Sequence, residues 1–179
     1  LSMLGSVCTL ASETCVENSD GVKIWYEFDS KTKTARVTHE GKRFRSWDNK
    51  YTGDVVIPSK VTYEGVEYDV TSIGNRAFSA CFNLTNISIP ESVTKIEKAA
   101  FKGCSKLTNV TIPENVTMIG KSAFESCSNL INVTIPESVT MIGKSAFKFC
   151  LRLTNVTIPE NVTMIGKSAF KFCLRLTNV

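Results

Sequence analysis

Histidine is almost missing from this sequence, which contains one such residue, His39, among 179. A Ser–His–Asp or Cys–His catalytic arrangement would therefore have to use His39. That residue lies in the polar stretch VTHEGKRFR, which is typical of an exposed hairpin edge, and no serine or cysteine is marked as its partner. A glycine-rich phosphate loop is also missing. We therefore predict a protein that is not an enzyme and has no catalytic residue or cofactor.

Long apolar runs and a large excess of one charge sign are missing as well. No stretch of about 18 apolar residues exists, so the sequence predicts no membrane span. The 21 Lys and Arg residues are nearly balanced by 17 Asp and Glu residues. The net charge of +4 is too small to favour nucleic acid as the main partner.

The cysteines lack the close pairing that structural zinc sites need. Two of the seven, Cys8 and Cys15, lie near the start of the chain and could pair with each other. The other five recur every 23 residues, and we expect them to be reduced, shielded thiols of a core rather than metal ligands. These five are Cys81, Cys104, Cys127, Cys150 and Cys173.

A strict internal repeat of 23 residues is the main positive feature of the sequence. A fixed period of this size is the signature of a solenoid, in which each coil buries its apolar side chains against its neighbours. Leucines and prolines recur in step with the cysteines, and phenylalanines mark the register at Phe78, Phe101, Phe124, Phe147 and Phe170. The sequence therefore predicts a mainly β solenoid with stacked coils.

Within one repeat, residues 155–158 alternate polar and apolar side chains, and Pro159 follows them. Thr, Val and Ile favour a strand, and proline ends it because proline cannot donate a ladder hydrogen bond. We expect one parallel strand per coil, and a second extended piece at VTMI that leads to a positive-φ corner at Gly166. The segment KSAFKFC is expected to form a short helical turn that places Phe170 in the core.

Three units divide the chain. Residues 1–20 are expected to be a signal remnant or a disordered terminus. Residues 21–52 alternate on either side of SKTK, which predicts a β-hairpin that caps the solenoid. Residues 53–179 form the solenoid, whose first unit is expanded by a hairpin that turns at Glu64 and Gly65, and whose last unit is truncated.

The pattern F..C..L.NVTIPE.VT.IG.SA closely resembles the BspA-like leucine-rich repeats of bacterial surface proteins, from about Gly53 to the end. The resemblance implies a leucine-rich-repeat solenoid, extracellular or cell-surface localisation, and binding to proteins of a host or of the extracellular matrix. The sequence departs from better-known leucine-rich repeats, because valine stands where those repeats bury asparagine, as at Val116 and Val139.

The exposed face of the repeated strand is the expected partner-binding site, because solenoids bind along such surfaces. Two other functions stay open, namely a carbohydrate-binding surface and a structural spacer within a larger surface protein. Two charged rows are expected to flank the site, namely the lysines Lys98, Lys121, Lys144 and Lys167 and the glutamates Glu91, Glu114, Glu137 and Glu160. The predicted site residues are Asn86, Ser88, Asn109, Thr111, Asn132, Thr134, Asn155 and Thr157.

The last two copies of the repeat are identical over residues 139–156 and 162–179. Nothing in the last copy has diverged toward a polar cap, which terminal repeats of solenoids carry for solubility. We therefore expect a fragment of a longer array. Its last coil could associate end to end with another copy.

Overall fold

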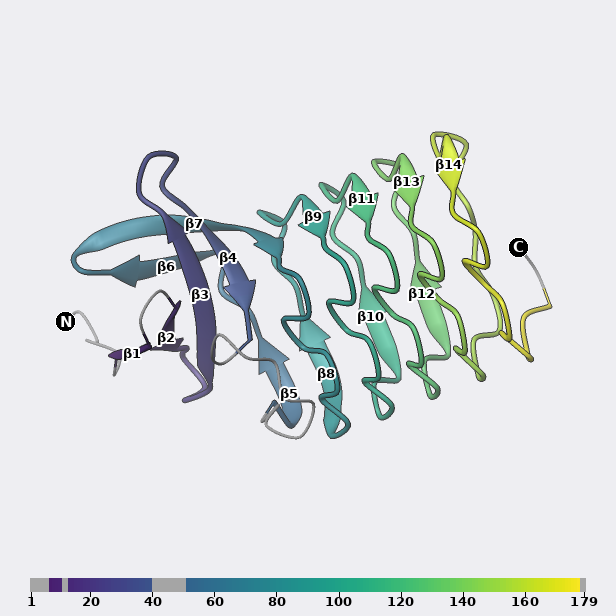
Figure 1. Ribbon diagram of the computed structural model, residues 1–179, viewed down its shortest axis with the longest axis horizontal. Coiled ribbons are helices and arrows are strands. Elements are labelled where there is room, and N and C mark those ends of the chain that lie inside the picture. Colours follow the sequence, from purple (N-terminus) through teal and green to yellow (C-terminus); the bar gives the residue numbers. More distant parts are fainter. Residues whose placement is uncertain (1–6, 11–12, 40–50, 178–179) are drawn as a thin grey trace.

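A computed structural model describes residues 7–10, 13–39 and 51–177 of the chain. The coils stack side by side along the long axis, with antiparallel strands at the N-terminal end (Figure 1). No helix occurs in the described part of the chain. The chain is thus a mainly β solenoid, as the repeat predicts.

The larger sheet joins the N-terminal strands to the solenoid. Its first four strands pair antiparallel, β4 then pairs parallel with β7, and the later strands continue in parallel, one from each coil. The strands are β1 (Val7–Leu10), β2 (Glu13–Glu17), β3 (Lys23–Asp29), β4 (Thr34–Thr38), β7 (Val66–Ile73), β9 (Lys95–Ile96), β11 (Met118–Ile119), β13 (Met141–Ile142) and β14 (Met164–Ile165).

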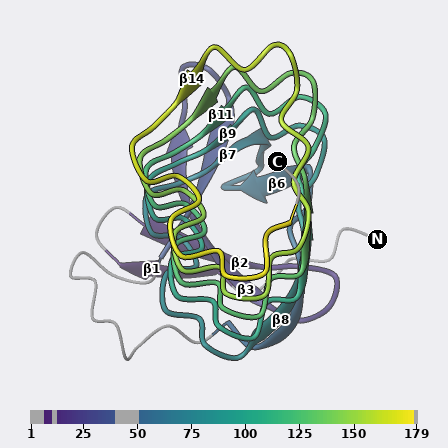
Figure 2. The ribbon, with the colours of Figure 1, turned by 90° about the vertical axis from the view of Figure 1, so that its right-hand side faces the viewer.

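A second row of parallel strands lies across the coils from the first (Figure 2). In it β5 (Gly53–Val56) pairs with β8 (Leu84–Ser88), and β10 (Asn109–Thr111) pairs with β12 (Asn132–Thr134). A single parallel bridge from Asn132 to Asn155 continues the row. Most coils therefore contribute two strand segments, because the VTMI piece also pairs from coil to coil.

Identical apolar side chains stack between the two rows. The rings of Phe78, Phe101, Phe124 and Phe147 are fully buried, and successive centroids lie 5.2 Å apart with rings within 8° of parallel. Phe170 extends the stack, with its centroid 5.3 Å from that of Phe147. Each coil thus covers the apolar face of the one before it, which is how a solenoid stabilises units that could not fold alone.

The corner after the second strand is a series of tight turns and not the helical turn that the sequence predicts. Ala146 N donates to Gly143 O at 3.1 Å and Cys150 N donates to Phe147 O at 3.2 Å, both within the coil. Between them, Phe147 N donates across to Ala169 O of the next coil at 2.8 Å. Alternate N–H groups therefore point along the solenoid axis, which a continuous helix does not allow.

The predicted positive-φ corner at Gly166 is also wrong. The left-handed residue of that corner is Ser168, with φ 62°, two positions later. The glycine column is required by close approach instead, because a Cβ atom on Gly143 would lie 2.5 Å from Lys121 N of the preceding coil. Glycine at this column lets neighbouring backbones touch.

Two hairpins build the N-terminal end. β3 and β4 pair antiparallel, and β6 (Lys60–Tyr63) pairs with β7 through a turn at Glu64 and Gly65, whose φ values are 50° and 76°. Two consecutive positive φ angles are typical of a type I′ hairpin turn. The inserted hairpin thus lies where the sequence predicts it.

Strands also occur in the segment for which the sequence predicts a signal remnant or a disordered terminus. Residues 13–17 form β2, which pairs with β3, so disorder does not describe this part of residues 1–20. Cys15 is fully buried and disulfide-bonded, and the β1–β2 register places Cys8 opposite it. Pairing with β3 explains the order, because a strand joined to a sheet satisfies its backbone hydrogen bonds.

Candidate functional site

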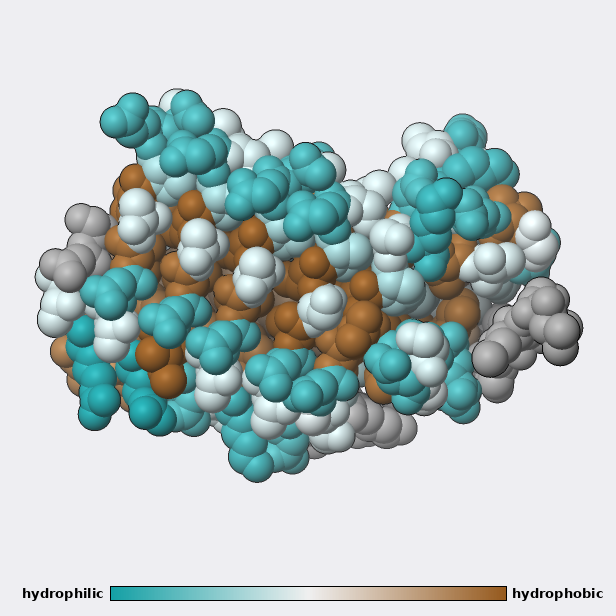
Figure 3. Space-filling model, turned by 180° about the vertical axis from the view of Figure 1, so that it is seen from behind, coloured by the Kyte–Doolittle hydropathy of each residue, from teal (hydrophilic) through white to brown (hydrophobic). Residues whose placement is uncertain are grey.

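All eight residues of the predicted binding site are exposed on one side of the coils, six of them on β8, β10 and β12. The parallel register places Asn109 beside Asn132 and Thr111 beside Thr134, so the side chains form two straight rows. We call this surface the Asn/Thr face. Viewed from behind, the molecule shows an apolar stripe along the coils between hydrophilic borders (Figure 3).

Asp54 closes the Asn/Thr face at its N-terminal end. Its Oδ1 atom accepts hydrogen bonds from Asn86 Nδ2 and from Thr85 Oγ1, both at 2.7 Å. The hydrogen bonds from Thr85 and then Asn86 lower the pKa of the Asp54 carboxyl. Further along, no side-chain hydrogen bond within the described residues engages Thr111 or Thr134, so their hydroxyls are available to a partner.

Large apolar side chains are exposed on the last two coils, and none of them is among the site residues predicted from the sequence. Phe149 and Phe172 stack with centroids 4.8 Å apart, and Lys148 and Lys171 each place Nζ about 5 Å from one of these rings. Leu151 and Leu174, two residues after these phenylalanines, are also exposed, and the exposed fraction of Leu174 is 74%. We call these four apolar residues, Phe149, Leu151, Phe172 and Leu174, the Phe/Leu patch.

The backbone at the two phenylalanines has the left-handed conformation. Their φ angles are 62° and 64°, a region that bulky residues rarely adopt and that costs about 1–3 kcal/mol. The equivalent residues of earlier coils are Ala80, Gly103 and Ser126, which are small. A repeat column that changes from small to aromatic residues is a signal that the sequence already contained.

A groove of about 650 Å³ follows the outer side of the strands β9, β11, β13 and β14. We call it the Met/Lys groove, because methionines and lysines of successive coils recur along it. Its lining includes Met118, Met141 and Met164, the glycines Gly120, Gly143 and Gly166, and the lysines Lys95, Lys98, Lys121 and Lys144. The lysine row, expected to flank the Asn/Thr strand, thus lines a surface of the other sheet.

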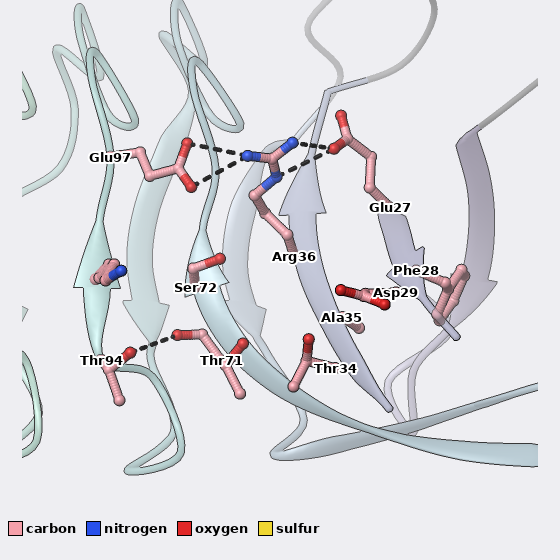
Figure 4. A pocket seen from close by; sticks show the side chains of 11 residues that line it. Glu27, Phe28, Asp29, Thr34, Ala35, Arg36, Thr71, Ser72, Thr94 and Glu97 are labelled. Atoms are coloured by element: carbon pink, nitrogen blue, oxygen red, sulfur yellow. Dashed lines mark hydrogen bonds and ion pairs between the residues drawn. The ribbon is translucent and has the colours of Figure 1, made fainter. Parts of the chain in front are cut away.

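A smaller pocket of about 360 Å³ lies where the N-terminal hairpin meets the first coils (Figure 4). Arg36 on β4 points between Glu27 of the hairpin and Glu97 of the second coil, and its Nη1 atom lies 3.3 Å from Glu97 Oε1. Hydrogen bonding to Glu27 is the main cause that raises the pKa of Arg36. The guanidinium is thus engaged by two carboxylates, and it joins the hairpin to the solenoid.

The cysteine column is reduced and shielded, as predicted, up to Cys150. Cys81, Cys104, Cys127 and Cys150 are free and fully buried, and Cys173 on the last coil is free and half-buried. Burial raises the pKa of the Cys104 thiol, which keeps it protonated and unreactive at neutral pH. In the part of the chain that the structure describes, no cluster of His, Cys, Asp or Glu side chains could hold a metal ion.

The sequence predicts His39 on an exposed hairpin edge. In the structure His39 follows β4 directly and is half-buried. No helix within the described ranges is long and apolar enough to cross a bilayer.

The stacked coils with parallel strands on opposite sides define a leucine-rich-repeat solenoid. The chain belongs to the BspA type leucine-rich repeat family, whose model matches six copies of the repeat over residues 54–179. Comparison with curated proteins gives no match.

Solved structures of bacterial leucine-rich repeat proteins are similar to this chain. One from Bacteroides ovatus has 39% identity and a TM-score of 0.77, over 87% of this chain and 39% of that protein. The T. pallidum leucine-rich repeat protein has 31% identity and a TM-score of 0.72, over 84% of this chain and 65% of that one. A leucine-rich cell surface protein of Faecalibacterium prausnitzii has 28% identity and a TM-score of 0.55, over 96% of this chain and 53% of that protein. The chain thus spans less than two thirds of the length of each.

Proposed function

We propose that this chain is a secreted or cell-surface module that binds protein partners, such as host or extracellular-matrix proteins, and so serves adhesion. The observation that carries the proposal is the Asn/Thr face, whose exposed rows repeat in register across the coils. Rows of amide and hydroxyl groups on a rigid sheet give a partner hydrogen-bonding positions that are fixed before binding. Similarity to a leucine-rich cell surface protein supports the location.

Polar rows alone make a modest binder, because the energy of protein interfaces is concentrated in aromatic and arginine anchors. The Phe/Leu patch supplies such anchors on the two coils that also carry Asn155 and its neighbours. Its rings are held in a costly backbone conformation while facing solvent. We infer that a partner contacts Phe149 and Leu151, whose coil is followed by another coil, together with the Asn/Thr face.

A triple substitution tests the proposal directly. The variant Asn109→Lys, Asn132→Lys and Asn155→Lys should lose binding to a panel of immobilised extracellular-matrix proteins in surface plasmon resonance. Each site is exposed, so each should change the free energy of unfolding by no more than about 0.5 kcal/mol. The matched control, Glu114→Gln, Glu137→Gln and Glu160→Gln, makes the same change in net charge at exposed residues of the same coils. Binding that survives in the first variant would contradict the proposed site.

A carbohydrate-binding surface is the second candidate function, because amide and hydroxyl rows also suit sugar hydroxyls. A glycan array distinguishes it, since glycan binding without matrix-protein binding would favour that function. If the chain binds neither matrix proteins nor glycans, the result would favour a structural spacer within a larger surface protein. End-to-end association through the last coil, which the sequence predicts, stays a further proposal.

A further inference from the structure

We propose that the Met/Lys groove is a second protein-binding site, and that its occupant is an acidic amphipathic α-helix lying along the solenoid axis. The groove lies along β9, β11, β13 and β14. These strands run on the opposite side of the coils from β8, the first strand of the Asn/Thr face (Figure 2). The inference does not depend on the function proposed above. It rests on the shape of the groove, its charge and the spacing of its side chains.

The floor of the groove exists because neighbouring coils touch there. The glycines at 120, 143 and 166 each allow a contact of the backbones at which a Cβ atom would lie 2.6 Å or less from the preceding coil. The same lack of side chains leaves a hollow between the methionines and the lysines of each coil. Methionine is unbranched and polarizable, so a row of methionines adapts to different apolar partners.

The lysines of the groove carry charge that the protein does not neutralise. Lys98, Lys121 and Lys144 are exposed, and within the described ranges none of them forms an ion pair. Like charges on adjacent parallel strands repel one another. A partner with carboxylates at the same spacing would relieve this repulsion and bind where the apolar floor already favours contact.

One acidic residue, Glu97, also lines the groove, but it is engaged elsewhere. Its Oε2 atom accepts from Asn75 N at 3.0 Å, and its Oε1 atom lies 3.3 Å from Arg36 Nη1. Glu97 replaces glycine in the glycine column, so its side chain stands at the N-terminal end of the hollow. The groove therefore runs from Glu97 toward Gly166, with the Glu97 carboxylate held by Asn75 and Arg36.

The spacing of the lysines selects a helix over an extended peptide. Successive coils lie about 4.8 Å apart, so three lysines span about 10 Å. Carboxylates one turn apart on an α-helix are separated by about 5.4 Å, so three of them span about 11 Å. On an extended strand, side chains of one face repeat every 6.7 Å or so, and three span about 13 Å. The mismatch grows by about 0.6 Å per coil for the helix and by about 1.9 Å per coil for the strand, so an extended peptide leaves the register of the lysines about three times faster.

Helix-in-groove recognition also accounts for the methionines. A helix that presents leucines on one stripe and glutamates along its edge would place the leucines on the methionine row and the glutamates against the lysines. A sulfated polysaccharide would satisfy the lysines, but it would leave the apolar floor without a partner. The chemistry of both rows together therefore favours a protein helix.

The test uses a synthetic peptide of about 18 residues, long enough to cover the groove at 1.5 Å per residue. Leucines occupy one helical stripe, and glutamates line its edge at intervals of one turn. A peptide of identical composition, scrambled to remove the stripe, is the first comparison. We expect the amphipathic peptide to bind in isothermal titration calorimetry and to gain helicity in circular dichroism when the 179-residue chain is added.

The double variant Lys121→Glu and Lys144→Glu should weaken this binding by about tenfold or more. The attraction between the groove lysines and the peptide glutamates becomes a repulsion between carboxylates. The matched control, Lys31→Glu and Lys106→Glu, makes the same charge change at exposed lysines outside the groove and should bind normally. Met118→Gln with Met141→Gln should weaken binding without changing its salt dependence. Melting temperatures close to that of the parent chain show that each variant is folded.

Three results would overturn the proposal. Equal binding of the scrambled peptide would remove the helical requirement, and unchanged binding by the Lys121/Lys144 variant would place the peptide elsewhere. Binding of heparin, but not of the peptide, would make the groove a polyanion site. The triple variant at Asn109, Asn132 and Asn155 should bind the peptide normally, so this test and that of the Asn/Thr face fail independently.

Discussion

The thiol of Cys127 donates a hydrogen bond to the backbone carbonyl of Phe101 in the preceding coil, with Sγ and O 3.1 Å apart. The same contact recurs one coil later, from Cys150 to Phe124 at 3.2 Å. The cysteine column is therefore a ladder of weak hydrogen bonds as well as a column of apolar atoms. Each coil is joined to its neighbour through its most buried corner.

Replacing Cys127 tests this contact. Serine keeps a hydroxyl within reach of the Phe101 carbonyl, whereas alanine keeps neither the donor nor the volume. We expect Cys127→Ser and Cys127→Ala each to lower the free energy of unfolding by about 1–2 kcal/mol in urea denaturation. If the serine variant is much less stable than the alanine variant, the carbonyl does not act as the acceptor.

The buried thiols also predict a loss of stability in mild alkali. Burial raises the pKa of Cys104 and Cys150 in the folded chain, so above the unfolded-state pKa of about 8.5 only the unfolded chain releases these protons. The unfolded state then binds fewer protons, and the free energy of unfolding falls by up to about 1.4 kcal/mol per pH unit for each thiol.

Urea melts at several values between pH 7.5 and pH 9.5 measure this dependence. Below the unfolded-state pKa the full contribution is present, so the stability should be flat there. The double variant Cys104→Ala and Cys150→Ala should show a shallower fall above pH 8.5. An equally steep fall in that variant would assign the effect to other groups.

A substitution in the Phe/Leu patch should abolish partner binding while it changes the stability of the chain only slightly. Phe149→Gly removes a stacked ring that contributes about 0.5–1.5 kcal/mol but also relieves a left-handed backbone at φ 62°. The two effects oppose each other, so the melting temperature should change by only a few degrees while binding to a matrix-protein partner is lost. A Phe149→Gly chain that binds normally would show that the exposed ring is not an anchor.

Among the substitutions considered, we expect replacement of a glycine in the glycine column to lower the free energy of unfolding most. Gly143→Ala would place Cβ 2.5 Å from Lys121 N and 2.6 Å from Gly120 C, both backbone atoms that cannot rotate away. We expect a loss of about 3 kcal/mol or more in thermal or urea unfolding. Lys144→Ala, at the next residue, is exposed and should stay within about 0.5 kcal/mol of the parent chain.

The period, the coil and its interior can be predicted from the residue pattern alone. Phe124, Cys127 and Leu130 are inward because the same apolar types recur every 23 residues, and such a pattern can be buried only by stacking. The exposed rows follow from the same alternation, since Asn109 and Thr111 lie on either side of the buried Val110. These features are local, so the residue pattern was sufficient to predict them.

Features that depend on the distance between coils become visible only in the folded chain. The role of Gly143 comes from a backbone contact with the preceding coil, and the turns after it alternate their hydrogen bonds between two coils. The Met/Lys groove forms for the same reason, because residues 23 positions apart become neighbours about 5 Å apart. The outer strand rows separate Asn132 from Lys144 although they lie in one repeat, and that separation follows from how the coil closes.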